Sequence, residues 1–105
     1  MKVLKSDIQV SKPYFLEIEN GVEAFIYLNT AGEYSCYKNI CPHMYIPLDY
    51  DDHDVLREDL NAFFCKTHGA LFSLANGECF AGPCVGQSLV AIDLQESKED
   101  IRLLL

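Results

Sequence analysis

Two short segments, each pairing one cysteine with one histidine, constrain this chain more than any other feature. They read C-P-H at residues 41–43 and C-K-T-H-G at residues 65–69, with twenty-one residues between the first histidine and the second cysteine. A structural zinc finger usually places its two cysteines together and its two histidines together. Because each segment here is mixed, two neighbouring loops are expected to meet around one metal centre, each supplying one thiolate and one imidazole.

The mixed segments indicate how four ligands could divide between two irons. Cys41 and Cys65 can bind one iron, while His43 and His68 reach outward to the other. A [2Fe–2S] cluster with these ligands is neutral when both irons are ferric, because imidazole adds no charge. It is therefore reduced more easily than an all-cysteine cluster. We predict a [2Fe–2S] cofactor bound by Cys41, His43, Cys65 and His68.

From residue 39 to residue 83 the chain resembles the Rieske iron–sulfur proteins. The resemblance depends on the C-P-H segment, the run from Cys65 to Phe72, and Gly82-Pro83 at a suitable distance beyond it. It implies an all-β fold, a Rieske-like antiparallel β sandwich or barrel in a single domain over residues 1–105, with a cluster-binding subdomain of two loops over about residues 39–83. It also implies that the Gly82-Pro83 loop covers the cluster, with Cys84 near it but not a ligand.

High-potential members of that family carry a disulfide between the two loops, and a serine and a tyrosine that bond to the cluster sulfurs. Matched motif to motif, this chain has Ile46, Thr67, Ala70 and Phe72 at those positions. Fewer donors stabilise the added negative charge less, so we predict a reduction potential in the lower part of the Rieske range, about −150 mV or somewhat above. This resembles the soluble, low-potential ferredoxins that serve oxygenases.

Alternating apolar residues predict strands through most of the chain. Residues 14–19, 22–28 and 33–39 form a predicted meander, and Asn20-Gly21 suits its first turn. Phe25 and Tyr27 lie opposite Ile26 and its neighbours, so the middle strand is expected to be covered on both faces. The remaining predicted elements are a helical turn over residues 54–60 capped by Asp54, strands at 61–64 and 70–74, and a final hairpin of 89–94 with 101–105.

A net charge of −8, with no basic cluster, argues against nucleic acid and membrane as partners. The acidic runs at residues 49–54 and 96–100 are interpreted as solvated surface. No apolar stretch approaches the length that spans a bilayer, and five cysteines are an odd number for a secreted disulfide framework. We therefore expect a cytoplasmic protein, with Cys36, Cys79 and Cys84 as buried packing residues.

The expected function is one-electron transfer, with no substrate turned over by this chain alone, because it has neither a nucleotide-binding glycine loop nor a nucleophile motif. The resemblance implies a flavin- or NAD(P)H-dependent reductase as donor and an oxygenase or similar acceptor. The apolar residues 44–47 are either core or a collar that a redox partner covers. Two alternatives remain: a small subunit similar to that of nitrite reductases, which often lack the ligands kept here, and a structural zinc module.

Overall fold

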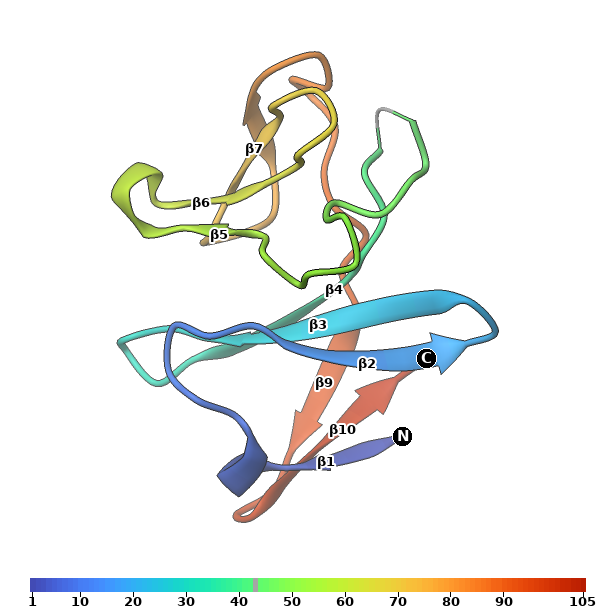
Figure 1. The fold of residues 1–105 in the computed structure, drawn as a ribbon. Coiled ribbons are helices and arrows are strands. Elements are labelled where there is room, and N and C mark those ends of the chain that lie inside the picture. The colour runs from blue at the N-terminus through green and yellow to red at the C-terminus, as the bar shows by residue number, and fades with distance from the viewer. Residues whose placement is uncertain (43) are drawn as a thin grey trace. The chain divides into compact units, whose positions relative to one another are not determined.

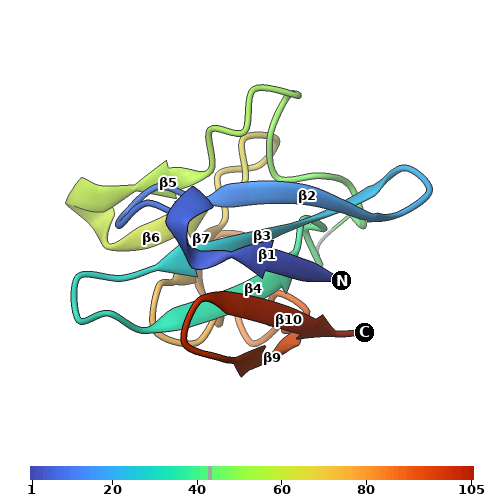
Figure 2. The ribbon, with the colours of Figure 1, turned by 90° about the horizontal axis from the view of Figure 1, so that it is seen from below.

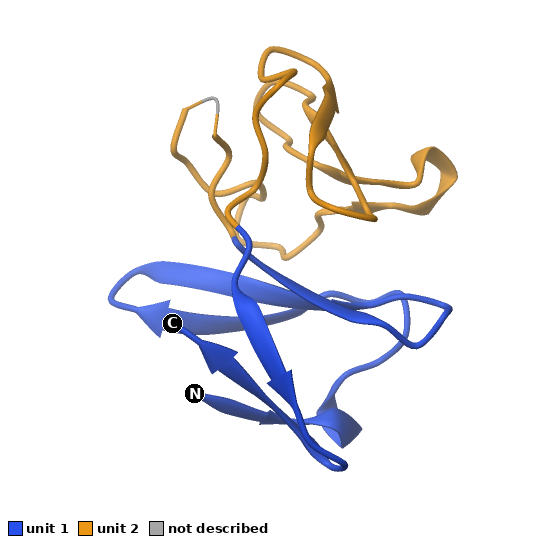
Figure 3. Ribbon diagram, turned by 180° about the vertical axis from the view of Figure 1, so that it is seen from behind, with its two compact units in different colours: residues 1–38, 91–105 blue, residues 39–90 orange. Residues whose placement is uncertain are grey.

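The computed structural model describes residues 1–42 and 44–105. These residues form two compact units, shown in blue and orange in Figure 3: unit 1 comprises Met1–Lys38 and Ala91–Leu105, and unit 2 comprises Asn39–Val90. His43, predicted as a cluster ligand, lies outside the described residues. Within the described part of the chain, no helix is long and apolar enough to cross a membrane.

Unit 1 contains two three-stranded antiparallel sheets (Figure 1). In the first sheet β3 (Val22–Leu28) lies between β2 (Tyr14–Glu19) and β4 (Tyr34–Lys38). In the second, β10 (Asp100–Leu104) lies between β1 (Lys2–Leu4) and β9 (Asp93–Glu96), as Figure 2 shows from below. A single 3-10 turn, η1 (Lys5–Asp7), follows β1.

The predicted meander is confirmed, with β3 at its centre. Every residue of β3 from Ala24 to Leu28 is buried, which confirms that this strand is covered on both faces. Gly21 has φ +76° at the predicted turn, a left-handed conformation that glycine adopts without steric penalty. The β2–β3 pairing shifts register between Glu17 and Glu19, so the hairpin carries a bulge that the Asn-Gly signal alone does not predict.

Apolar side chains from both sheets form the core of unit 1. β3 and β4 contribute Ala24, Ile26, Leu28 and Cys36, and the second sheet contributes Val3, Ile101 and Leu103. Full burial of one aliphatic side chain of this kind stabilises a fold by about 1.5–3 kcal/mol. Cys36 is a packing residue as predicted, and burial raises the pKa of its thiol to about 12.

Unit 2 contains one four-stranded antiparallel sheet in the order β5-β6-β7-β8. Phe63 and Phe72, which face each other across β6 and β7, are fully buried, as are Leu48 and Val55 in the segment before the sheet. With antiparallel sheets in both units, the predicted all-β class is confirmed. The strands are β5 (Leu56–Arg57), β6 (Ala62–Phe64), β7 (Leu71–Ser73) and β8 (Cys79–Ala81).

Several short elements differ from the prediction. The helical turn expected over residues 54–60 is instead β5 followed by a 3-10 turn, η2 (Glu58–Leu60), and no side chain caps that turn. Asp54, the expected cap, instead binds the side chain of Arg57. The final hairpin is present, but its first strand begins at Asp93 rather than Leu89. β1, β5 and β8 were not predicted, because two or three residues are too few to show a periodic pattern.

Candidate metal centre

The first Cys-His segment follows β4 and closes into a small hydrogen-bonded ring. The Cys41 backbone N–H donates to the Ile46 carbonyl at 2.6 Å, and the Tyr45 N–H donates to the Cys41 carbonyl at 2.7 Å. Tyr45 has φ +57°, an uncommon conformation for an aromatic residue, and its side chain is 81% exposed. Cys41 is only 1% exposed, so this ring contains both a buried thiol and an exposed aromatic side chain.

The second segment follows β6 and closes into a ring of the same design. The Cys65 N–H donates to the Ala70 carbonyl at 2.9 Å, and the Gly69 N–H donates to the Cys65 carbonyl at 2.9 Å. Gly69 has φ +72°, and a Cβ placed on it would meet Phe64 only at 3.9 Å. The positive φ favours glycine at this position.

The two rings therefore share one backbone pattern around their cysteines. In each, the cysteine N–H donates to the carbonyl five residues later, and its carbonyl accepts from the N–H four residues later. The residue four positions after the cysteine, Tyr45 or Gly69, has a positive φ in both rings. Of the two, only Gly69 carries a sequence signal for this conformation, so the match between the rings was not predicted.

The rings are tied to each other by the backbone. The N–H of Lys66, next to Cys65, donates to the carbonyl of Leu48 at 2.9 Å, two residues beyond the first ring. Cys65 is fully buried, whereas the side chain of His68 is exposed. Among the described candidate ligands, the two sulfurs are therefore buried and the imidazole of His68 is exposed.

A buried polar network connects the residues on either side of the first ring. The Asn39 side chain accepts a hydrogen bond from the Leu48 N–H at 3.0 Å and donates to Asp49 Oδ1 at 2.9 Å. Asp49 Oδ2 accepts from the His53 N–H at 2.7 Å. Asn39 and Asp49 are only 3% and 7% exposed. The prediction that the whole acidic run 49–54 is solvated is therefore wrong at Asp49, whose buried carboxyl group accepts hydrogen bonds from two donors, the Asn39 side chain and the His53 N–H.

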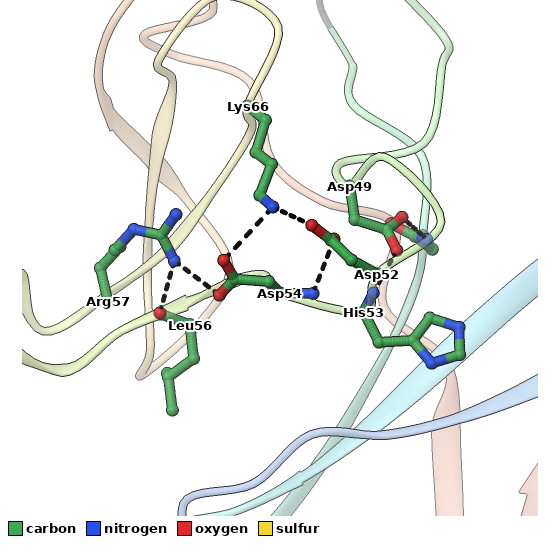
Figure 4. Close-up of polar contacts among 8 residues, drawn as sticks. Asp49, Asp52, His53, Asp54, Leu56, Arg57 and Lys66 are labelled. Carbon is green, nitrogen blue, oxygen red and sulfur yellow. Dashed lines mark hydrogen bonds and ion pairs between the residues drawn. The ribbon is translucent and has the colours of Figure 1, made fainter.

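Charged side chains bind the segment 49–60 to the second ring (Figure 4). Lys66 Nζ pairs with Asp52 and, at 3.2 Å, with Asp54 Oδ2, while Arg57 Nη1 donates to Asp54 Oδ1 at 2.9 Å. The hydrogen bond from Lys66 lowers the pKa of Asp52, and those from Arg57 and then Lys66 lower the pKa of Asp54. The same carboxylates, Asp52 first, raise the pKa of Lys66.

A third loop of unit 2 lies against the second ring. Gly82 has φ +95°, and a Cβ placed on it would lie 2.8 Å from the Cα of Ala70. Two residues later, Cys84 is buried, and this burial, followed by its bond to Cys79, raises the pKa of its thiol to about 12. The charges of Cys41 and Cys65 also raise this pKa, so both ring thiols lie within electrostatic reach of Cys84.

The described residues include three of the four predicted ligands. Among them, with His43 left out, no three Cys, His, Asp or Glu side chains are grouped to hold a metal ion. A Rieske-type pair of irons has two protein ligands on each iron rather than four on one. Two buried thiols from matched rings and an exposed imidazole fit that arrangement. The class defined by this fold and these donors is an all-β iron–sulfur protein.

The comparison with known families identifies the class more closely. The family model described as the Rieske [2Fe-2S] domain matches residues 2–97. The chain therefore belongs to the Rieske [2Fe-2S] domain family, and its cofactor is a [2Fe–2S] cluster. No curated protein gives a significant match.

Solved structures show the same fold at low sequence identity. The ferredoxin of carbazole 1,9a-dioxygenase from Nocardioides aromaticivorans IC177 is 20% identical with a TM-score of 0.74, covering 96% of this chain and 91% of that one. The plasma membrane Rieske protein PetC3 from Synechocystis PCC 6803 is 19% identical with a TM-score of 0.74, covering 97% and 95%. A chain in the reduced complex between oxygenase and ferredoxin in carbazole 1,9a-dioxygenase is 19% identical with a TM-score of 0.79, covering 98% of this chain but 27% of that one.

Proposed function

We propose that this chain is a one-electron carrier whose cluster is bound by Cys41 and Cys65 at one iron and by His43 and His68 at the other. The observation that carries the proposal is the pair of matched rings, each holding a buried cysteine, with an exposed histidine in the second. The role of His43 follows from its sequence position two residues after Cys41. The chain itself turns over no substrate.

The cysteine and histidine ligands have different roles in such a carrier. When bound, the cluster supplies a centre that accepts and releases one electron. Cys41 and Cys65, at 1% and 0% exposed, keep water away from the thiolate side. His68 is exposed and offers a docked partner the shorter route. The hydrogen bond from the Lys66 N–H to the Leu48 carbonyl joins the segments that carry the two thiols.

Metal analysis of the purified protein tests the cofactor and its ligands. We expect about two irons and about two acid-labile sulfides per chain, with a visible absorption band and an EPR signal after reduction. Cys65→Ser and His68→Ala should each lose this signal, whereas Cys36→Ser, which changes a buried thiol of unit 1, should keep it. A colourless protein with one zinc per chain would contradict the proposal.

We propose a flavin- or NAD(P)H-dependent reductase as electron donor and an oxygenase as acceptor. In support, one structural relative is the ferredoxin of a carbazole 1,9a-dioxygenase, and another comes from a complex between oxygenase and ferredoxin. The net charge of −8 favours partners with basic docking surfaces. NADH-driven reduction by a reductase of this class should slow as ionic strength rises, and a rate that ignores salt would count against such docking.

We also propose that residues 1–105 form a single domain working in the cytoplasm, with the cluster-binding part over about residues 39–83. In support, unit 2 begins at Asn39 and contains both rings, and a reducing compartment suits five cysteines that form no disulfide in the structure. Urea unfolding followed by tyrosine fluorescence and by cluster absorption should give coincident transitions. Gel filtration tests the alternative of a subunit, which predicts a stable larger assembly instead of a free carrier.

A further inference from the structure

Two cysteines outside the proposed ligand set lie with their sulfurs almost in contact. Cys79, at the start of β8, and Cys84, after the Gly82-Pro83 turn, have their Sγ atoms 2.7 Å apart. Each is only 2% exposed. A covalent disulfide has a sulfur separation of ~2.05 Å, so little movement would be needed to form one. We propose that Cys79 and Cys84 form a second redox site, a dithiol that a small peroxide converts reversibly to a disulfide.

The backbone holds the two thiols together independently of any metal. The Cys79 N–H donates to the Gln87 carbonyl at 2.8 Å, and the Gln87 N–H donates to the Cys84 carbonyl at 2.9 Å. Gln87 thus connects the backbones of both cysteines. The Cys84 thiol donates to the Cys79 sulfur, and the Cys79 thiol donates to the Ala81 carbonyl at 3.2 Å. Both thiols are therefore oriented within one short turn, which lowers the entropy lost when they join.

The burial of the pair selects the size of the oxidant. The sequence neighbours of the pair are exposed, namely Phe80 and Val85 next to the two cysteines and Gly82-Pro83 between them. The two cysteines themselves are 2% exposed, so the thiol of another protein cannot reach them unless the loop opens. Hydrogen peroxide is far smaller and needs less opening, which is why we name a peroxide rather than a protein disulfide.

The reaction balances as two successive steps. Hydrogen peroxide first oxidises the Cys79 sulfur to a sulfenic acid, breaking the O–O bond, forming an S–O bond and releasing one water. Cys79 reacts first because the raised pKa of the Cys84 thiol makes Cys84 the weaker nucleophile. The second thiol then displaces the hydroxyl group, forming the S–S bond and releasing a second water. Two electrons pass from the sulfurs to the peroxide, and both thiol protons leave in water. A thiol reductant reverses the change by disulfide exchange.

Oxidation would join Cys79 to Cys84 and so close a covalent loop over residues 79–84. This loop includes the turn at Gly82, which packs on Ala70 of the second ring. Gly82 lies so close to Ala70 that a single added methyl group would meet its Cα at 2.8 Å. Locking this turn should slow backbone hydrogen exchange over residues 82–87. This second readout depends on the loop rather than on the cluster.

Thiol trapping with mass spectrometry tests the proposal on the purified holoprotein. After peroxide treatment and denaturing alkylation, we expect two fewer alkylated cysteines than the five of the reduced chain, and a peptide linkage between Cys79 and Cys84. A thiol reductant should restore all five. Cys84→Ser should abolish the linkage and leave Cys79 as an oxygen adduct, whereas Cys36→Ser, a change at an equally buried thiol, should leave the linkage intact.

The proposal is overturned if both thiols stay fully alkylatable in the oxidised wild type, or if the linkage joins Cys84 to Cys41 or Cys65 instead. Peptide mapping of the wild type decides this even if Cys84→Ser does not fold. Cluster absorption, recorded in parallel, separates this outcome from the proposed electron-carrier function. The Cys79–Cys84 linkage can be measured whether or not the protein holds a cluster.

Discussion

At the scale of single residues, Gly82 and Asn39 show how unit 2 is held in shape by atoms that are not ligands. Gly82 has a positive φ and lies close to the backbone of Ala70, and Asn39 is buried and its side chain makes two hydrogen bonds. Both positions touch the segments that carry the cysteines: Gly82 lies against Ala70, and Asn39 binds Leu48. Changes at either position should therefore affect stability and the retention of the cluster together.

Gly82→Ala should lower the free energy of unfolding more than Gly86→Ala does. Both glycines have φ +95°, so alanine brings roughly 1–3 kcal/mol of backbone strain to each. At Gly86 the new methyl group meets nothing within 4 Å, while at Gly82 it meets the Ala70 backbone at 2.8 Å. Urea unfolding of both variants measures the difference, and equal losses would show that the contact with Ala70 carries no energy.

Asn39→Ala should destabilise the protein by roughly 1–3 kcal/mol for each buried partner that it leaves unsatisfied. The partners are the Leu48 N–H and the carboxylate of Asp49. Asn29→Ala is the matched control, because Asn29 also accepts from backbone N–H groups, those of Ala31 and Glu33, but at an exposed turn where water can replace it. Similar denaturant midpoints for the two variants would contradict the importance of burial.

At the scale of elements, the segment 49–60 acts as a brace for the second ring. Two of its carboxylates, those of Asp52 and Asp54, pair with Lys66, which follows Cys65 directly. This segment has almost no regular secondary structure, only two residues of β5 and the turn η2, so its shape depends on side-chain pairing. The pairing is exposed and is therefore sensitive to pH and salt.

Lys66→Gln should raise the pKa of Asp52 toward its ordinary value and that of Asp54 only in part, because Arg57 still binds Asp54. Arg57→Gln should instead raise the pKa of Asp54 and leave the pKa of Asp52 nearly unchanged. NMR titration of the two carboxyl carbons measures both effects. Equal shifts at both carboxylates in both variants would show that the four charges do not pair selectively.

The stability lost in Lys66→Gln should itself depend on pH. A lowered carboxylate pKa stabilises the folded state above the ordinary value of about 4, and this contribution disappears as pH falls through the lowered pKa. The raised pKa of Lys66 stabilises below about 10.4 and is lost as pH rises further. Wild type and variant should therefore differ in unfolding midpoint at pH 7, and the difference should shrink as pH falls through the lowered pKa values of Asp52 and Asp54.

At the scale of the whole molecule, charge and cofactor act together on electron transfer. The chain carries −8 and adds one negative charge on reduction. Negative charge on the protein opposes that step, and the positions where high-potential relatives place hydroxyl donors hold Ala70 and Phe72. Ala70 and Phe72 are both fully buried, so water does not take the place of the missing hydroxyl groups at these two positions.

The reduction potential is expected in the lower part of the Rieske range, about −150 mV or somewhat above. Redox titration followed by EPR measures it directly. Phe72→Tyr adds a hydroxyl where high-potential relatives carry one and should raise the potential, while Phe63→Tyr, at its equally buried cross-strand neighbour, serves as control. A wild-type potential of several hundred millivolts positive would contradict the expectation.

The sequence by itself determined the features that depend on residue type and local periodicity. The alternation in residues 14–28 predicts β2 and β3 because side chains on a strand alternate between faces. The order of Cys41, His43, Cys65 and His68 predicts the ligand chemistry, because few other centres use two mixed pairs. The matching of the chain to the Rieske family over residues 2–97 confirms the resemblance that these motifs indicated.

The tertiary structure alone decided which distant atoms meet. Nothing in the acidic run distinguishes Asp49, yet it is buried because Asn39 and the His53 N–H satisfy it. Tyr45 carries no sign of a left-handed conformation, and it adopts one because hydrogen bonds close the first ring as they do the second. Cys79 and Cys84 read as packing residues, and their sulfurs approach because the backbone turns at Gly82. Such contacts depend on the path of the whole chain, which local sequence patterns do not encode.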